Sequence, residues 1–459
     1  MLDTKFILKS TNGELMSEGV DMEFSGISTD SRTIEKGQLF VALKGENYDG
    51  HKFICDAINR GAAGVVAEQL CDKSKPANKL YIRVGSTLNS LGNLAKSWRE
   101  GFENLKVIAI TGSNGKTTTK EMVSAVVSKK YNVHKNTGNF NNLIGLPLTI
   151  FNLQPENQVA VLELGMNQFG EIKRLSEICS PDVGIITNIG KAHIGNLGGI
   201  EGVKLAKGEL VENFNSEQTF IVNKDDPRVL DIAAGARCKK ITYSLSGDAD
   251  VQATDINTDG LSSTYFTLKI GDKTNLVRLK NIGLHNVSNA LCAASAGVIM
   301  GIDIEQIADA LEKFEFPKMR LEIINTSDGL RIINDCYNAN PDSMKNAINI
   351  LAELNGDFNR IAVLGDMLEL GEDAEKEHKE LGKHIASAGI DYLFTYGQLG
   401  ETIHYGTKGS VMGGSFNDHK IIADQIKHVA KKGDVILIKG SRGMKMENIL
   451  RHLGVQEKT

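Results

Sequence analysis

The sequence predicts an α/β protein with three domains, of which the central one contains a P-loop-type, mostly parallel, doubly wound sheet. Its 459 residues suggest about three domains, at roughly 150 residues each. Short apolar runs of the kind found in buried strands recur at 106–110, 159–164, 183–187 and 219–223, and helical patterns such as 200–214 lie between them. Strands that alternate with helices in this way are typical of a parallel sheet covered on both faces.

Three segments differ in their pattern and give the predicted domains 1–104, 105–317 and 318–459. The first is a smaller α/β domain that mixes short strands with one clear helical pattern. In the second, residues 250–282 alternate apolar and polar side chains around turn residues, which predicts antiparallel hairpins. The third begins with a predicted hairpin at 321–333 and continues as a Rossmann-like α/β domain. Further elements are expected as helices at 90–102, 342–354 and 372–388 and as strands at 361–364, 392–395 and 435–438.

Composition and charge exclude several classes of protein. With 41% hydrophobic residues, 24% charged residues and 7 prolines, the chain resembles an ordinary globular protein. A net charge of -5 gives no sign of binding to nucleic acid or to an anionic membrane. The N-terminus lacks the order of a signal peptide, and the longest apolar run, near 290–301, is too short to span a membrane. We therefore expect a soluble cytoplasmic protein whose six cysteines, including Cys71, are free thiols in a reducing compartment.

The sharpest local signal is a phosphate loop at residues 110–119, which read Ile-Thr-Gly-Ser-Asn-Gly-Lys-Thr-Thr-Thr. It follows a predicted strand and opens a predicted helix, so that glycine N–H groups and the helix N-terminus can surround phosphate oxygens. Lys116 can reach the β and γ phosphates, and the hydroxyl of Thr117 can ligate Mg²⁺. Ile110 stands where the full Walker pattern has glycine, and a glycine-rich turn of ordinary kind is the alternative. The motif alone predicts binding and cleavage of a nucleoside triphosphate, and leaves switch, motor, kinase and ligase open.

The altered loop resembles that of the Mur ligase superfamily, which includes the peptidoglycan amino-acid ligases and folylpolyglutamate synthase. Within the superfamily, residues 364–371 (Leu-Gly-Asp-Met-Leu-Glu-Leu-Gly) look like the MurF branch, which joins D-alanyl-D-alanine to UDP-N-acetylmuramoyl-tripeptide. So many separate motifs in the same order make a chance similarity very improbable. The other matching stretches lie at 139–147, 163–167, 187–193, 206–209, 285–290 and 334–341.

The resemblance implies an ADP-forming acid–D-amino-acid ligase that acts through an acyl phosphate. Its product would be the UDP-MurNAc-pentapeptide precursor of peptidoglycan, which links the chain to cell wall biogenesis, cell shape and cell division. The implied plan is an N-terminal UDP-substrate-binding domain, a central ATP-binding domain and a C-terminal ligase domain that closes over the site. ATP, one or two Mg²⁺ ions and the two substrates are the expected partners of a monomer that binds neither nucleic acid nor membrane.

Two alternatives remain open. One is another Mur-type ligase that adds a different amino acid or glutamate. The lysine-or-diaminopimelate branch normally carries an Asp-Tyr-x-His type sequence and a downstream Asp-Asn-Pro motif, and neither is present. The other is a nucleotide-switched binding protein, which gives no reason for the uridine-site pattern near the N-terminus. The sequence does not tell whether the tripeptide ends in lysine or diaminopimelate, or which residues bind the dipeptide.

The resemblance assigns Mg²⁺ to Thr117, Glu163, His193 and Lys207. Taken alone, Glu163 could be a solvated acid at a strand end, and His193 could be a structural histidine. Lys207 would ordinarily be a solvent-facing lysine of a helix. In related ligases the matching lysine carries CO2 as a carbamate, which requires a neutral amine and therefore a lowered pKa. Lys116, His193, Lys207 and Asn142 are the predicted catalytic residues.

The remaining site residues are implied by the same resemblance. Without it, the two asparagines at 286 and 289 could simply begin a helix, and residues 28–32 could form a charged hairpin turn. The predicted ATP-binding residues are Gly112, Ser113, Asn114, Gly115, Lys116, Thr117, Thr118, Asn286, Asn289, Arg320 and Asp335. The predicted substrate-binding residues are Ser28, Thr29, Asp30, Ser31, Arg32, Lys44, Gly45, Asn139, Asn142, Tyr337, Asn338 and Asn340.

Overall fold

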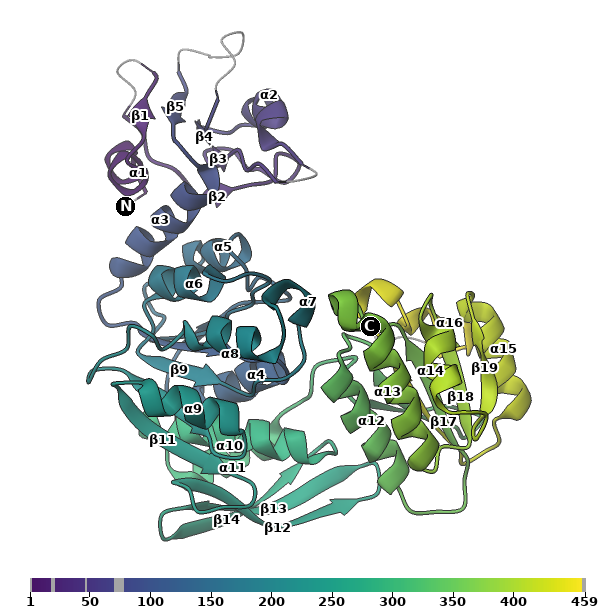
Figure 1. Ribbon diagram of the computed structural model, residues 1–459. Helices are drawn as coiled ribbons and strands as arrows, with labels where there is room; N and C mark the ends of the chain where they lie inside the picture. Colours follow the sequence, from purple (N-terminus) through teal and green to yellow (C-terminus); the bar gives the residue numbers. More distant parts are fainter. Residues whose placement is uncertain (1, 18–20, 46–47, 70–77, 456–459) are drawn as a thin grey trace. The chain divides into compact units, whose positions relative to one another are not determined.

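The described part of the chain, in a computed structural model, comprises residues 2–17, 21–45, 48–69 and 78–455 (Figure 1). Within these ranges the strands form sheets of five, nine and six strands. Cys71, predicted to be a free thiol, lies outside the described residues. No helix within them is long and apolar enough to cross a lipid bilayer.

The five-stranded sheet belongs to the N-terminal segment and has the order β1-β5-β4-β3-β2. β1 is antiparallel to β5, and the other neighbours are parallel. Successive side chains alternate between its faces, so that Leu39 and Val41 pack with Ile7 while Phe40 packs with Ile54. Helices therefore cover both faces. The elements are α1 Thr4–Thr11, β1 Glu14–Leu15, β2 Ile27–Ser28, β3 Leu39–Val41, η1 Gly50–Phe53, α2 Ile54–Asn59, β4 Gly64–Ala67, β5 Leu80–Arg83 and α3 Thr87–Glu100.

The nine-stranded sheet has the order β14-β13-β12-β11-β10-β9-β6-β8-β7. β7 and β8, β10 and β11, and β11 and β12 pair in parallel, as the alternation of strands and helices predicts. β12, β13 and β14 form the antiparallel hairpins expected at 250–282. The strands are β6 Lys106–Thr111, β7 Val133–Lys135, β8 Val159–Glu163, β9 Val183–Ile186, β10 Thr219–Asn223, β11 Lys239–Ser244, β12 Val251–Asp259, β13 Ser263–Ile270 and β14 Lys273–Leu279.

Helix α10 is largely buried and packs against α4 and α11. Gly297 permits this approach, since a Cβ there would lie 2.8 Å from Val126. The helix predicted at 200–214 ends at Gly208, because the chain then continues in separate turns that still bury Val211 and Phe214. The helices are α4 Lys116–Val127, α5 Gly145–Phe151, α6 Glu171–Cys179, α7 Ile194–Leu197, α8 Ile200–Gly208, α9 Pro227–Gly235, α10 Leu284–Ile299 and α11 Ile304–Lys313.

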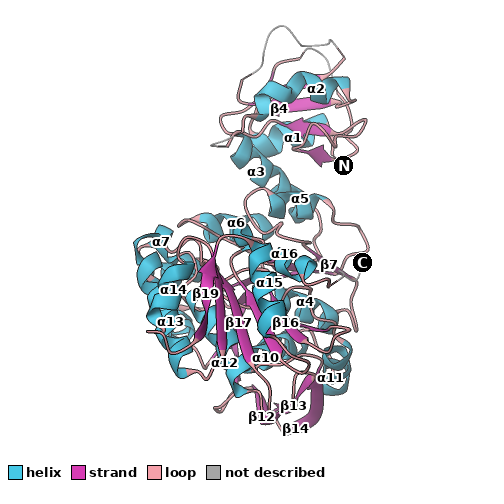
Figure 2. Cartoon of the chain, turned by 90° about the vertical axis from the view of Figure 1, so that its right-hand side faces the viewer, coloured by secondary structure: helices cyan, strands magenta, loops and turns pink. Residues whose placement is uncertain are grey.

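The six-stranded sheet of the C-terminal segment has the order β15-β16-β20-β17-β18-β19. β15 is antiparallel to β16 and the other neighbours are parallel, and helices lie on both sides of the sheet (Figure 2). Ile332, Val363 and Ile438 pack with Ile422 and Ile449 on one face. The elements are β15 Glu322–Asn325, β16 Arg331–Asp335, α12 Pro341–Glu353, β17 Arg360–Gly365, η3 Gly371–Asp373, α13 Ala374–Ser387, β18 Tyr392–Tyr396, α14 Gly400–Gly406, β19 Met412–Phe416, α15 His419–Val429, β20 Val435–Lys439, η4 Arg442–Met444 and α16 Glu447–His452.

Candidate active site

The phosphate loop joins β6 to α4 and takes a backbone shape that requires glycine at two positions. Gly112 has φ +147 and Gly115 has φ +79, values that other residues rarely adopt. A Cβ on Gly112 would lie 1.9 Å from Oγ1 of Thr187, and a Cβ on Gly115 would lie 2.5 Å from Oδ1 of Asn289. Both torsion and space therefore exclude larger residues, and a ligand can approach the bare backbone closely.

Groups that follow β9 hold the phosphate loop in this shape. The N–H of Ser113 donates to the backbone oxygen of Asn188 at 3.0 Å, and the N–H of Asn114 donates to its Oδ1 at 2.9 Å. The hydroxyl of Thr187 donates to the backbone oxygen of Asn114 at 2.6 Å. The Ser113 hydroxyl donates to the carbonyl of Gly190 at 2.9 Å and accepts from its N–H at 2.8 Å. The loop is therefore preorganised by hydrogen bonds to the neighbouring strand end.

The start of α4 has the properties of an anion site. Its N-cap is Gly115, which has no side chain that could cap the helix, and the first N–H groups and the positive end of the helix dipole lie at the loop. Nζ of Lys116 donates to the carbonyl of Gly112 at 2.8 Å, which places the ammonium over the loop. Thr118 is buried in the first turn. These features fit a nucleoside triphosphate, as the motif predicts.

Residues of the C-terminal segment also contact the phosphate loop. The guanidinium of Arg320 lies 4.0 Å from the ring centre of Tyr337 and donates to the hydroxyl of Thr117 at 2.9 Å. Asn340 caps α12 with its side-chain oxygen and donates through Nδ2 to Oδ1 of Asn114 at 2.7 Å. The structure thus places three predicted residues, Arg320, Tyr337 and Asn340, at the loop.

Lys439 links Asp335 to Asn338 near the ends of two parallel strands. Asp335 ends β16 and is in register with Lys439, which ends β20. Nζ of Lys439 lies 2.6 Å from Oδ2 of Asp335 and donates to the carbonyl of Asn338 at 3.0 Å. The other carboxylate oxygen of Asp335 accepts from the N–H of Leu321 at 3.2 Å. This ion pair fixes the turn after Arg320.

Asn286 and Asn289 are buried and hydrogen-bonded inside the protein. The hydroxyl of Thr119 donates to Oδ1 of Asn289 at 3.1 Å, which ties α10 to α4. Nδ2 of Asn289 donates to Oδ1 of Asn286 at 3.4 Å, and Nδ2 of Asn286 donates to the carbonyl of Ile282 at 2.9 Å. These contacts support the helix that follows the phosphate loop, and the role implied at adenine stays a prediction.

Glu163 ends β8 with a side chain that is buried, the whole residue being only 4% exposed. Its Oε1 accepts from Nδ2 of Asn141 at 2.8 Å, and its backbone N–H and carbonyl are both bonded to the side chain of Asn136 at 2.9 Å. The predicted Asn139 and Asn142 are both exposed, and Oδ1 of Asn142 accepts from the N–H groups of Ile144 and Gly145 just before and at the start of α5. A buried, oriented carboxylate is a suitable hard-oxygen ligand for Mg²⁺.

His193 and Lys207 are held differently from each other. Nδ1 of His193 lies 2.7 Å from Oε2 of Glu369, and this contact holds the pKa of the Glu369 carboxyl below its ordinary value. Lys207 is 1% exposed, so the interpretation as a solvent-facing lysine is wrong. Within the described residues, no three His, Cys, Asp or Glu side chains converge as a metal cluster. Sparse protein ligation is usual for Mg²⁺, which keeps water and phosphate ligands.

The predicted uridine loop in the N-terminal segment is polar and internally bonded. Arg32 makes a paired contact with Asp30 at 2.7–3.2 Å, and the guanidinium lowers the pKa of that carboxyl to about 2. The hydroxyl of Ser28 bonds the backbone of Asp30. Asp49 orients His51 through Nδ1 at 2.7 Å. Of the other predicted residues Ser31 is buried, Thr29 is half-buried, and Lys44 and Gly45 are exposed.

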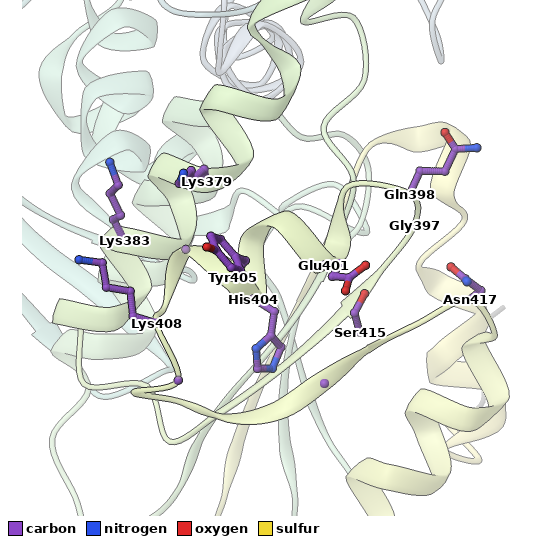
Figure 3. Close-up of a pocket in the computed structure, with 13 residues that line it drawn as sticks. Lys379, Lys383, Gly397, Gln398, Glu401, His404, Tyr405, Lys408, Ser415 and Asn417 are labelled. Carbon is purple, nitrogen blue, oxygen red and sulfur yellow. The ribbon is translucent and has the colours of Figure 1, made fainter.

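A separate hollow of about 1200 Å³ lies in the C-terminal segment, beside α13, α14 and β19 (Figure 3). Lys379, Lys383, Glu401 and Tyr405 are among the residues that line it, and no predicted site residue is among them. Because the hollow contains none of the predicted site residues, the phosphate loop remains the candidate active site.

Several residues of the site are not evident from the sequence. They contact other site residues from distant parts of the chain, and no local pattern shows these contacts. The polar stretch 136–142 and the motif 364–371 are signals for some of them, because both overlap stretches that match the resembling family. The missed residues are Asn136, Asn141, Thr187, Asn188, Asp342, Glu369 and Glu377.

Comparisons with known proteins cover nearly the whole chain. A family model described as the Mur ligase middle domain matches residues 110–297. The Mur ligase glutamate ligase domain matches residues 319–442, and the Mur ligase family catalytic domain matches residues 23–99. The matched ranges include the phosphate loop and the C-terminal residues that contact it.

Individual relatives agree with the family models. The chain is 42% identical to the UDP-N-acetylmuramoyl-tripeptide–D-alanyl-D-alanine ligase of Bacillus subtilis, over 93% of each chain, and 34% identical to that of Escherichia coli, over 96% of each. Its structure resembles crystal structure I of MurF from Acinetobacter baumannii with a TM-score of 0.90 and 33% identity, over 99% of each chain. It also resembles MurF from Thermotoga maritima in complex with ADP, with a TM-score of 0.84 and 28% identity, over 93% of this chain and 96% of that one. The chain therefore belongs to the Mur ligase family.

Proposed function

We propose that this protein is the ATP-dependent ligase that joins D-alanyl-D-alanine to UDP-N-acetylmuramoyl-tripeptide. The products are UDP-MurNAc-pentapeptide, ADP and phosphate. The observation that carries the proposal is the preorganised phosphate loop, contacted by Arg320 and Asn340, in a chain 42% identical over 93% of its length to a relative of that name.

We infer three domains, 1–104, 105–317 and 318–459, each of which contains one sheet and has its own role. The N-terminal domain binds the uridine nucleotide through residues 28–32, together with Lys44 and Gly45. The central domain binds ATP at the phosphate loop. The C-terminal domain supplies Arg320, Asp335 and the residues that receive the dipeptide, Tyr337, Asn338 and Asn340. The matched family ranges and the separate sheets support these boundaries.

The reaction needs two steps because a carboxylate is a poor electrophile. An oxygen of the tripeptide carboxylate attacks the γ-phosphorus of ATP, and ADP leaves. The free amine of D-alanyl-D-alanine then attacks the carbonyl carbon of the acyl phosphate, loses a proton, and phosphate leaves. Lys116 and Arg320 offset the negative charge that develops in the first step. Asn340 contacts Asn114 of the loop, and we infer that the C-terminal domain limits the access of water, which would hydrolyse the acyl phosphate.

We infer one or two Mg²⁺ ions from the family resemblance, and the hydroxyl of Thr117 and the buried carboxylate of Glu163 are oxygen donors of the kind that Mg²⁺ prefers. Thr117 and Glu163 would hold the ion, with His193 and a carbamylated Lys207 as the further donors. When bound, Mg²⁺ neutralises phosphate charge and orients the γ-phosphate. Lys207 is buried rather than solvent-facing, and this burial supports a role for it inside the site.

We further infer that the enzyme works as a monomer in the cytoplasm. The test of the function measures phosphate release with ATP and UDP-MurNAc-tripeptide, with and without D-alanyl-D-alanine. Release should require both substrates. Lys116→Ala should abolish it, whereas Lys129→Ala, which removes a lysine just beyond α4 that pairs with Asp309, should leave it unchanged. Equal release without either substrate would reject the ligase function.

A further inference from the structure

The 190–195 loop, which follows β9 and ends in the first turn of α7, is contacted by acidic side chains from the C-terminal segment. Oδ2 of Asp342, at the start of α12, accepts from the N–H of Lys191 at 2.7 Å. Oε1 of Glu377, in α13, lies 2.6 Å from Nζ of Lys191. Oε2 of Glu369 lies 2.7 Å from Nδ1 of His193. Three carboxylates thus contact one short loop. The two that contact Lys191, Asp342 and Glu377, stand 151 and 186 residues further along the chain.

The backbone is in equally close contact there. The N–H of Gly195 donates to the carbonyl of Glu369 at 3.4 Å, and a Cβ on Gly195 would lie 2.7 Å from the backbone nitrogen of Gly371. A Cβ on Gly190 would lie 2.4 Å from Oδ2 of Asp342. The two glycines therefore allow the acidic residues to reach the loop.

The ion pair between Lys191 and Glu377 is unequal in its exposure. The Lys191 side chain is 38% exposed, whereas the Glu377 side chain is 4% exposed. Oε2 of Glu377 is buried and has no hydrogen-bond partner among the described residues. A buried carboxylate that depends on one partner is strongly destabilised when that partner is removed, whereas removal of both charges costs much less.

The 190–195 loop is also attached to the phosphate loop. Gly190 exchanges two hydrogen bonds with the side chain of Ser113, at 2.8 and 2.9 Å. Nδ1 of His193, further along the loop, lies 2.7 Å from Oε2 of Glu369. A histidine that ligates a metal is usually oriented by a carboxylate on its other ring nitrogen.

We propose that Asp342, Glu377 and Glu369 form an acidic clamp that couples seating of the C-terminal segment to the position of the 190–195 loop. These are positioning residues, because they act through Lys191, His193 and Gly190 rather than on the reacting atoms. With the clamp closed, His193 has its catalytic orientation and Ser113 is supported. The proposal rests on the proposed function for its kinetic consequences but not for its structural ones.

The structural test is hydrogen exchange of the full-length protein, read at the amides of Lys191 and Gly195. Asp342→Asn and Glu377→Gln should each speed exchange there about tenfold, since each weakens the closed clamp. Glu380→Gln is the matched control, because Glu380 pairs with Lys383 on the exposed face of the same helix as Glu377, at 2.5 Å. Exchange that is the same in all three variants as in the wild type would overturn the proposal.

A double-mutant cycle separates a clamp from a merely structural helix. Lys191→Met leaves the Glu377 carboxylate buried without a partner and should lower kcat about a hundredfold, more than Glu377→Gln does. Adding Glu377→Gln to Lys191→Met should then raise kcat to the level of Glu377→Gln alone, and Lys191→Arg should remain close to the wild type. KM for ATP should change less than kcat, because the phosphate loop itself is intact.

The two levels of failure are distinguishable. If amide exchange in the 190–195 loop is faster in the variants but phosphate release needs no dipeptide, the clamp is supported and the proposed reaction is refuted. If phosphate release behaves as proposed but Lys191→Met and the double variant are equally impaired, the clamp is refuted.

Discussion

The substitution Gly112→Ala tests whether the phosphate loop depends on its glycine. A residue with a side chain at φ +147 adds backbone strain of about 1–3 kcal/mol. The new Cβ would also lie 1.9 Å from Oγ1 of Thr187, which must move away from the carbonyl of Asn114 and lose a hydrogen bond worth about 1 kcal/mol. The total is about 2–4 kcal/mol, the sum of these two contributions.

This cost should lower either the free energy of unfolding or the affinity for ATP, and both can be measured. If the loop keeps its shape, the free energy of unfolding in urea falls by that amount. If the loop relaxes, the affinity for ATP falls instead, on the order of a hundredfold for about 3 kcal/mol. Binding is measured by calorimetric titration with a non-hydrolysable ATP analogue, and phosphate release is measured alongside.

A matched control separates strain from the contact with Thr187. Gly389 has φ +72, and a Cβ added there would have no atom within 4 Å, so Gly389→Ala introduces a positive-φ alanine in open space, outside the site. It should lower stability by about 1 kcal/mol and leave ATP affinity unchanged. If Gly112→Ala matched the wild type within about 0.5 kcal/mol in both stability and affinity, the dependence of the loop on its glycine would be refuted.

Three other features of the structure give testable predictions. Arg320→Lys keeps the charge but loses the planar stack on Tyr337 and the oriented hydrogen bond to Thr117. The value of kcat/KM should therefore fall at least about tenfold in the phosphate-release assay, and an unchanged value would contradict the role of Arg320. Asn136→Ala removes the partners of the Glu163 backbone and should lower the free energy of unfolding in urea by about 3 kcal/mol, with less than about 1 kcal/mol arguing against it. Burial lowers the pKa of His285 to about 4, whereas the unfolded chain binds the proton from about pH 6.5, so the folded state loses stability as pH falls from about 6.5 towards 4. His285→Gln should flatten the dependence of the free energy of unfolding on pH in this range, and an unaltered slope would exclude His285 as its source.

Local signals explain why much of the fold and the loop can be predicted. Buried parallel strands appear as apolar runs, and the glycines and Lys116 stand in a strand–turn–helix setting that the structure confirms. Family membership, predicted from motifs, is confirmed by the comparisons. In contrast, β19 is not predicted, because its Met-Gly-Gly-Ser-Phe sequence lacks the apolar, β-branched residues typical of a strand.

Contacts between distant segments explain the rest. Arg320 reaches Thr117 across 203 residues of sequence, and Asn340 reaches Asn114 across 226. No periodicity records such a pairing, and for the same reason the contact between His193 and Glu369 cannot be foreseen. Lys207 is ambiguous in the sequence because a helix pattern shows which positions are polar, whereas burial of a lysine depends on what packs over it.

Asn340 uses the two ends of one amide group for different purposes. Its side-chain oxygen caps the start of helix α12, and its side-chain nitrogen donates to Asn114 in the phosphate loop. A serine or an aspartate could begin the helix equally well, but neither offers an amide donor in the same place. Mutational drift at this position can therefore leave the protein well folded while uncoupling it from its nucleotide, so thermal stability alone would be a poor guide to whether a variant still works.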